Sequence, residues 1–273
     1  MKYFNRFPVV EYDGKVAKNI LARVDFIDSS KRDIYSNFDY VLEEGSSRPD
    51  IISNNYYNSP YYDWLICLSN GVIDPYHDYY RSAEDFQSYI TAKYGSTTIA
   101  RRNILFYRND WSSDESLINE SVYDNLQPVI KKYWKPKLNN TSQIVGYERV
   151  KEDWTVSTNQ IVKLVITSNL DNFNVGDVIE QDDAEGTVIL KNADDNSITL
   201  QHITGAFVAN TADGITSATI LSKNISDLEA SFWSPVTAYD YEEEQNELKR
   251  YVNIIKASYL PDIEKQFVEL IKR

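Results

Sequence analysis

Apolar positions recur with two different periods near the start of the chain. Residues 38–42 place apolar side chains at every second position, which predicts a short, half-buried strand. Pro49 can occupy the first turn of a helix, and we expect a short helix over residues 49–55 with Ile51 and Ile52 facing inward. The change of period marks the boundary between a strand and a helix.

A second short helix is predicted directly afterwards. Ser59 can cap it and Pro60 can occupy its first position, while residues 61–69 place apolar side chains on one helical face. Asn70 and Gly71 end it, because both tolerate the left-handed backbone found at helix C-termini. The predicted core of this small module is Ile51, Ile52, Tyr61, Trp64, Leu65 and Leu68.

A third helix is predicted over residues 83–94, since Ser82 and Asp85 resemble a capping box and Gly95 can close the last turn. Pro128 interrupts any long helix in the segment that follows. The other predictions for this part are a strand over residues 104–108, a mixed segment over 116–134, a loop over 135–140 and a strand over 144–154.

The composition changes at residue 160, where aromatic residues become scarce and Val, Ile, Thr, Asp and Gly dominate as far as residue 224. This change predicts an inserted all-β domain, a small barrel or sandwich, because the β-branched stretches alternate with turn residues. Its five predicted strands cover residues 161–166, 178–179, 186–190, 197–200 and 218–221.

The C-terminal part ends in a helix that begins near Pro261, while residues 250–256 fit either a strand or a helix. The fold class expected for the whole chain is α+β, with a small α/β core and a separate β-domain. The expected parts are an N-terminal arm and module (1–95), a mixed connecting segment (96–159), the β-domain (160–224) and a C-terminal strand and helix that return to the core (225–273).

Charge excludes several classes of partner. The chain has 273 residues with 28 Lys and Arg against 41 Asp and Glu, a formal net charge of −13. We therefore expect no binding to nucleic acid or to an anionic membrane surface, because both depend on clustered basic residues. The N-terminus lacks the apolar stretch of a secretory signal, and the single cysteine, Cys67, fits a reducing compartment.

Candidate catalytic residues are scarce. Only His77 and His202 could act as imidazole bases, and no serine lies in a nucleophile elbow. One cysteine and two distant histidines do not make a zinc site. The acidic pairs near Asp182 and Asp194 lie in predicted turns and lack the spacing of a calcium loop, although calcium and a glycosidase carboxylate pair remain alternatives. We expect no enzyme activity, no metal and no cofactor.

Residues 48–80 read helix, turn, helix, Asn-Gly, Asp-Pro, and resemble a LysM-type module, with Trp64 on the second helix and Asn70 after it. This order, together with residues 82–95, 232–241 and 246–270, is similar to the baseplate wedge family of T4-type contractile-tailed phages. The resemblance implies that residues 250–256 form a strand. It departs at residues 160–224, which look like an insertion.

The resemblance implies a virion structural protein of the tail baseplate, assembled in the host cytoplasm, present in six copies and packed on other wedge and sheath-initiator-type proteins. The excess of Tyr, 21 residues, suits such contact surfaces. The alternative is a LysM-like protein that binds cell-wall glycan (peptidoglycan). The candidate partner interface comprises Tyr76, Tyr79, Tyr80, Phe232 and Trp233.

Overall fold

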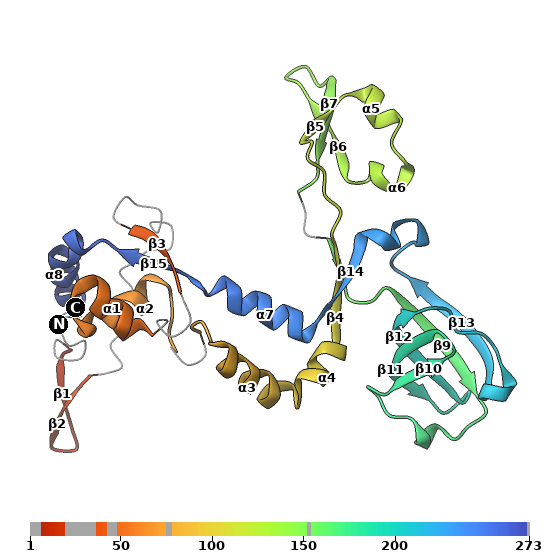
Figure 1. Cartoon of the computed structure of the whole chain (residues 1–273), viewed down its shortest axis with the longest axis horizontal. Coiled ribbons are helices and arrows are strands. Elements are labelled where there is room, and N and C mark those ends of the chain that lie inside the picture. The colour runs from red at the N-terminus through yellow and green to blue at the C-terminus, as the bar shows by residue number, and fades with distance from the viewer. Residues whose placement is uncertain (1–6, 20–36, 43–47, 75–77, 152–153, 272–273) are drawn as a thin grey trace. The chain divides into compact units, whose positions relative to one another are not determined.

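The chain divides into two units, and Figure 1 labels their helices and strands. The computed structural model describes residues 7–19, 37–42, 48–74, 78–151 and 154–271. Unit 1 combines residues 1–100 with residues 239–273, and unit 2 consists of residues 101–238. Both helices and sheets are present, with a separate multi-stranded sheet, so the α+β class is confirmed.

The core of unit 1 joins the two ends of the chain. Strand β3 (Asn37–Val41) pairs antiparallel with β15 (Tyr251–Ile255), and helices α1 (Pro49–Tyr57) and α2 (Asp63–Ser69) contribute to the same core, with the short 3-10 helix Pro60–Tyr62 between them. Residues 251–255 therefore form a strand, which lies within the range 250–256 that the family resemblance implied. Helix α8 (Leu260–Ile271) adds Phe267, whose ring lies 4.6 Å from that of Trp64.

Most of the predicted core residues of this module are enclosed. Ile52, Trp64 and Leu65 are buried, whereas Ile51 and Leu68 are partly buried. The prediction is wrong for Tyr61, which is 50 % exposed. Tyr61 lies in the 3-10 helix, whose three-residue turn breaks the 3.6-residue period on which the prediction depended.

Side chains bind the outer edge of β15, and among the described residues no second strand pairs with that edge. The Asn70 side chain accepts a hydrogen bond from the Asn253 N–H (2.7 Å) and donates to the Asn253 carbonyl (3.0 Å), which is how a neighbouring strand would pair. Ser69 also donates to that carbonyl, and the Tyr57 hydroxyl donates to the Ile255 carbonyl at 2.7 Å. Side chains from α1, α2 and the residue that caps α2 thus satisfy the Asn253 N–H and the carbonyls of Asn253 and Ile255.

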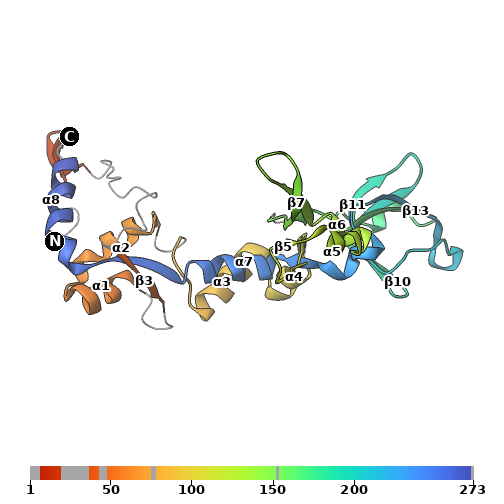
Figure 2. The same ribbon diagram turned by 90° about the horizontal axis from the view of Figure 1, so that it is seen from above.

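Two antiparallel helices, α3 (Ala83–Tyr94) and α7 (Ala238–Leu248), lie side by side in both views (Figures 1 and 2). Helix α3 begins and ends as predicted, with the Ser82 hydroxyl accepting from the Asp85 N–H. Phe86, Ile90 and Tyr239 are buried between the two helices with Ala100 of helix α4 (Thr97–Arg102). Helices α4 and α7 were not predicted from the sequence.

An additional β-hairpin near the N-terminus was also missed. Strands β1 (Val9–Tyr12) and β2 (Lys15–Lys18) pair through a turn in which Asp13 and Gly14 both have positive φ. The Asp-Gly pair was the available signal, because this dipeptide favours the tight turn of a hairpin. At its base, Phe7 is buried in the core of unit 1.

Unit 2 begins with a three-stranded sheet of order β14 (Trp233–Thr237), β4 (Ile104–Asn109) and β8 (Thr155–Val156). A second sheet has the order β5 (Leu117–Ile118), β7 (Ile144–Arg149) and β6 (Trp134–Leu138), with short helices α5 (Glu120–Asp124) and α6 (Pro128–Lys131). The loop predicted over residues 135–140 is wrong, because most of it forms β6. The strand predicted to continue to Trp154 ends at Arg149.

Aromatic residues fill the interior of this second sheet. Trp111 stacks on Tyr133 with ring centres 4.5 Å apart, and Tyr123 stacks on Tyr147. Trp134 is buried beside them, and Trp154 packs against Tyr133. Aromatic side chains are therefore the main constituents of this small core, which contains few aliphatic residues.

All five predicted strands of the β-domain are present. They form one antiparallel sheet of order β10 (Val178–Gln181), β11 (Ala184–Asn192), β12 (Ser197–Thr204), β9 (Gln160–Ile166) and β13 (Ile215–Lys223). Bulges in β11 and β13 increase its curvature. Within residues 154–271 the edge strands β10 and β13 do not pair, so the expected barrel is not closed.

Candidate functional site

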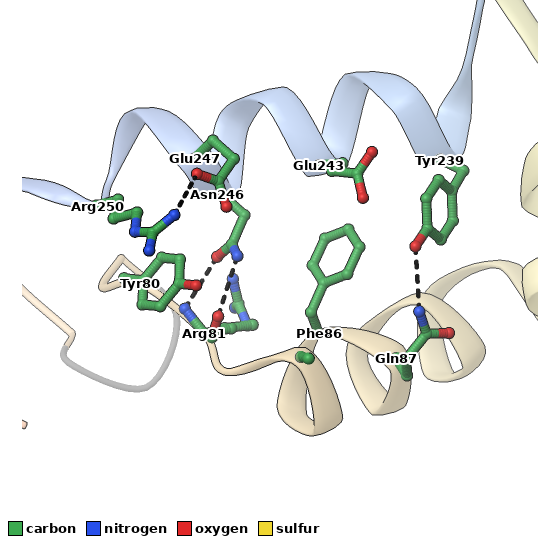
Figure 3. A pocket seen from close by; sticks show the side chains of 10 residues that line it. Tyr80, Arg81, Phe86, Gln87, Tyr239, Glu243, Asn246, Glu247 and Arg250 are labelled. Carbon is green, nitrogen blue, oxygen red and sulfur yellow. Dashed lines mark hydrogen bonds and ion pairs between the residues drawn. The ribbon is translucent and has the colours of Figure 1, made fainter. Parts of the chain in front are cut away.

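A pocket opens between the antiparallel helices α3 and α7 of unit 1 (Figure 3). Its volume is about 430 Å³, and its lining combines buried aromatic rings with charged side chains. Phe86 and Tyr239 are each 5 % exposed. Arg81 and Glu243 lie on the α3 and α7 sides respectively. The mixed lining suits contact with a polar protein surface better than the enclosure of an apolar ligand.

Hydrogen bonds fix the two sides of the pocket to each other. The Asn246 side chain accepts from the Arg81 N–H at 2.9 Å and donates to the Arg81 carbonyl at 3.0 Å. Gln87 donates to the Tyr239 hydroxyl at 3.1 Å. Asn246 is 8 % exposed, so its bonds with the segment before α3 are shielded from water. These hydrogen bonds consequently hold the two helices together within unit 1.

Glu242, in the middle of α7, binds residues near the C-terminal end of α3. Its carboxylate is paired with Lys93 at 2.6 Å and accepts hydrogen bonds from the hydroxyls of Tyr89 (3.0 Å) and Tyr94 (2.9 Å). Burial opposes ionisation of the carboxyl, but the hydrogen bonds from Lys93, Tyr94 and Tyr89 outweigh it, so the pKa of Glu242 is lowered. The same pairing raises the pKa of Lys93.

Glu242→Gln is expected to weaken the helix pair by about 1–2 kcal/mol near neutral pH, because the amide loses the ion pair with Lys93. The lowered pKa of Glu242 means that this stabilisation is present above the carboxyl's unfolded pKa and disappears as the pH falls through its folded pKa. Urea-dependent hydrogen exchange of residues 83–94 measures the difference.

Glu243→Gln is the matched control, because Glu243 is exposed on the same helix. Equal losses in the two variants, or a loss in Glu242→Gln that persists unchanged under acidic conditions, would contradict the assigned role of Glu242.

The two described candidate interface residues after α2, Tyr79 and Tyr80, do not form one exposed surface. Tyr79 is 5 % exposed and belongs to the core of unit 1, so its prediction as an interface residue is wrong. The segment returns into the molecule there, because Asp78 accepts from the Ile73 and Asp74 N–H groups and closes the loop. Tyr80 is partly buried and lines the α3–α7 pocket. Tyr76 lies outside the described residues.

Phe232 and Trp233 are partly buried within unit 2. The Phe232 carbonyl accepts from the Asp110 N–H at 2.7 Å, and Trp233 begins β14 opposite Asn109. Trp233 also lines a second pocket of about 340 Å³. Both residues thus have local packing partners, and their contact with another protein stays a prediction.

The imidazole and thiol groups singled out in the sequence and described by the structure, His202 and Cys67, belong to different units. His202 is 9 % exposed, packs near the Tyr107 ring, and has its pKa lowered by burial. Burial, followed by the charge of Asp63, raises the pKa of the Cys67 thiol to about 11, which makes it a poor nucleophile at neutral pH. His77 lies outside the described residues. Within the described ranges, no three His, Cys, Asp or Glu side chains are grouped to hold a metal ion.

No helix in the described part of the chain is long and apolar enough to span a membrane. The features described in the two units are hydrophobic cores, hydrogen bonds between helices α3 and α7, and surface pockets.

Comparison with known families gives a match that covers the N-terminal part of the chain. Residues 4–112 match the family described as base plate wedge protein 53. The predicted recognition of a baseplate wedge family is confirmed. This range contains β3, α1, α2 and α3, but not β15, α7 or α8, with which they pack.

The match indicates a structural role in a phage baseplate and a place in the virion tail. No curated protein matches the chain. The likeness of residues 48–80 to a LysM module stays a prediction, although the β3–α1–α2–β15 core is present. Sequence reasoning missed Glu242 and Asn246, because the acidic run around them gives no apolar stripe strong enough to predict α7.

Proposed function

We propose that this chain is a scaffold subunit that packs on neighbouring wedge proteins and helps to join wedges into the baseplate ring. The family match over residues 4–112 is the observation that carries the proposal. The expected stoichiometry is six copies per baseplate, and the expected neighbours are other wedge and sheath-initiator-type proteins. Assembly would take place in the host cytoplasm, without catalysis by this chain.

The hydrogen-bonded helices α3 and α7 support a role in packing on other proteins. Asn246 binds the segment before α3, and Glu242 binds Lys93, so both contacts lie within unit 1. A helix pair held in this way presents a fixed surface, which suits a subunit that contacts neighbouring proteins.

Co-expression with the neighbouring tail proteins, followed by size-exclusion chromatography, tests the proposal. We expect the chain to elute in a complex with at least one wedge protein. A chain that elutes alone in the presence of every baseplate partner would contradict the scaffold role. Binding to insoluble peptidoglycan is the parallel assay for the glycan alternative, in which we expect the chain to stay in the supernatant.

The aromatic residues of the LysM-like segment do not favour the glycan alternative. Sugar rings stack on exposed aromatic faces, but Trp64 is only 7 % exposed and packs on Phe267. Tyr61 is exposed, but it lies in a short 3-10 helix and lines neither of the two pockets described above.

A further inference from the structure

The hairpin formed by β1 and β2 exposes most of its side chains within the part of the chain that the structure describes. Among the described residues these two strands pair only with each other. Val9 is 58 % exposed, Val16 is 77 % exposed, and all four residues of β2 are exposed. An isolated two-stranded hairpin is only marginally stable in water. The hairpin therefore has the properties of an arm that is completed by another sheet.

The two strands of the arm differ in their ability to accept a neighbour. Strand β2 has Lys15 and Lys18 at its two ends, and exposed lysines protect a strand edge from pairing. Strand β1 reads Val-Val-Glu-Tyr and has a single charge, Glu11. The free edge of β1 is therefore the better site for an added strand.

Most sheet edges in unit 2 are protected against such pairing. Strand β6 carries Lys135, Pro136 and Lys137, and β14 contains Pro235. Strands β5 and β8 have only two residues each, and β10 contains Glu180 before an acidic turn. Short length, proline and charge are the usual means of preventing edge-to-edge association.

Strand β13 lacks that protection over most of its length. Residues 215–222 contain neither a charge nor a proline, and Ile220 and Leu221 are 57 % and 55 % exposed. Two bulges leave residues 217–220 in regular register with β9. That regular stretch has the same length as β1, which has four residues. Residues 217–220 carry no charge, so a β1 strand paired with them would not bring Glu11 next to another negative charge of that stretch.

We propose that the β1–β2 arm of one copy adds to the β13 edge of a second copy. The contact joins different surfaces of the two chains, and such head-to-tail contacts generate rings when the rotation closes. One four-residue pairing is a small interface, so each contact is weak by itself and gains strength when several copies are held together. The inference rests on the proposed scaffold role only in expecting copies to be neighbours.

Disulfide trapping between two differently tagged full-length copies tests the contact. One copy carries Val10→Cys and the other Thr219→Cys, and a copper–phenanthroline oxidant converts two adjacent thiols into one disulfide. Facing residues of paired strands have the Cα separation that a disulfide needs. Cys67 gives little background, because its raised pKa keeps it protonated.

The matched control replaces Thr219→Cys by Val175→Cys, since Val175 is 66 % exposed and lies outside every strand of the sheet. We expect a several-fold excess of cross-linked product with Thr219→Cys, and loss of that excess when Ile220→Lys is added to the same copy. Unchanged hydrogen exchange of β9 shows that the Ile220→Lys copy is folded. Equal trapping at both positions, or none, overturns the inference.

The result is separable from that of the scaffold test. A chain that enters a complex with wedge proteins but fails to cross-link keeps its proposed function and loses the arm contact. A chain that cross-links but binds no wedge protein loses the scaffold role alone.

Discussion

Removal of residues 251–273 is expected to unfold the core built by β3, α1 and α2, although every residue of those three elements is retained. Strand β15 supplies Val252, Ile254 and Ile255 to this core, and α8 supplies Phe267. Burying side chains of this size contributes about 1.5–3 kcal/mol each, so the four together approach the whole stability of a typical domain.

Hydrogen exchange read by mass spectrometry measures the effect in the full chain. Peptides from residues 48–69 are expected to lose protection after the truncation, while peptides from the β-domain, residues 160–224, keep theirs as an internal control. The β-domain has its own core of Val162, Leu164, Leu200 and other buried residues. Retained protection of residues 48–69 would show that the family-matched segment folds without the C-terminal strand.

A single substitution distinguishes the effect of losing side-chain packing from the effect of removing residues 251–273. Phe267→Ala removes a fully buried ring that packs on Trp64, and a cost of about 3–5 kcal/mol is expected. Gln266→Ala is the matched control, because Gln266 is the exposed neighbour on the same helix. Similar exchange in the two variants would contradict the place given to Phe267 in this core.

Local structure was predictable wherever the chain carried its own start and stop signals. Helix α3 has Ser82 before it and Gly95 after it, and the predicted bounds agree with the observed ones. The five strands of the β-domain follow from β-branched stretches separated by turns. Helix α7 lacks such signals: Glu242, Glu243 and Glu244 occupy its middle, so its one buried stripe is hidden in an acidic run.

Contacts between distant segments could not be predicted from periodicity. Leu42 and Arg250 are bonded across 208 residues of sequence. The pattern of residues 250–256 fitted a strand or a helix, and only the family resemblance decided for the strand. The burial of Tyr79 likewise could not be predicted from the sequence. Its tyrosine-rich neighbourhood suggested an exposed contact surface, but the loop closed by Asp78 returns it to the core. Burial depends on where the chain turns, which composition does not reveal.

Replacing Asn70 is expected to lower the free energy of unfolding by a large amount for the few atoms that it removes. Its amide nitrogen donates to the carbonyls of Ile66 (2.8 Å) and Asn253, and its oxygen accepts from the Asn253 N–H. Asn70→Ala leaves that N–H without its partner at the edge of β15. A loss of about 2–3 kcal/mol is expected, because an unsatisfied backbone group is added to the lost hydrogen bonds.

Asn70→Asp has the same shape and isolates the donor function. At neutral pH its carboxylate can accept from the Asn253 N–H but faces the carbonyls of Ile66 and Asn253, to which the native amide donates. The variant should be at least as unstable as Asn70→Ala near pH 7 and should recover part of the loss in acid, where a protonated carboxyl regains one donor.

Asn140→Ala, in an exposed turn, is the control, and urea-dependent hydrogen exchange of residues 251–255 is the measurement. If the stability of Asn70→Asp equalled that of the native chain, Asn70 would not replace a strand partner for β15, and the edge of this strand would have to be held by Tyr57 and Ser69 alone.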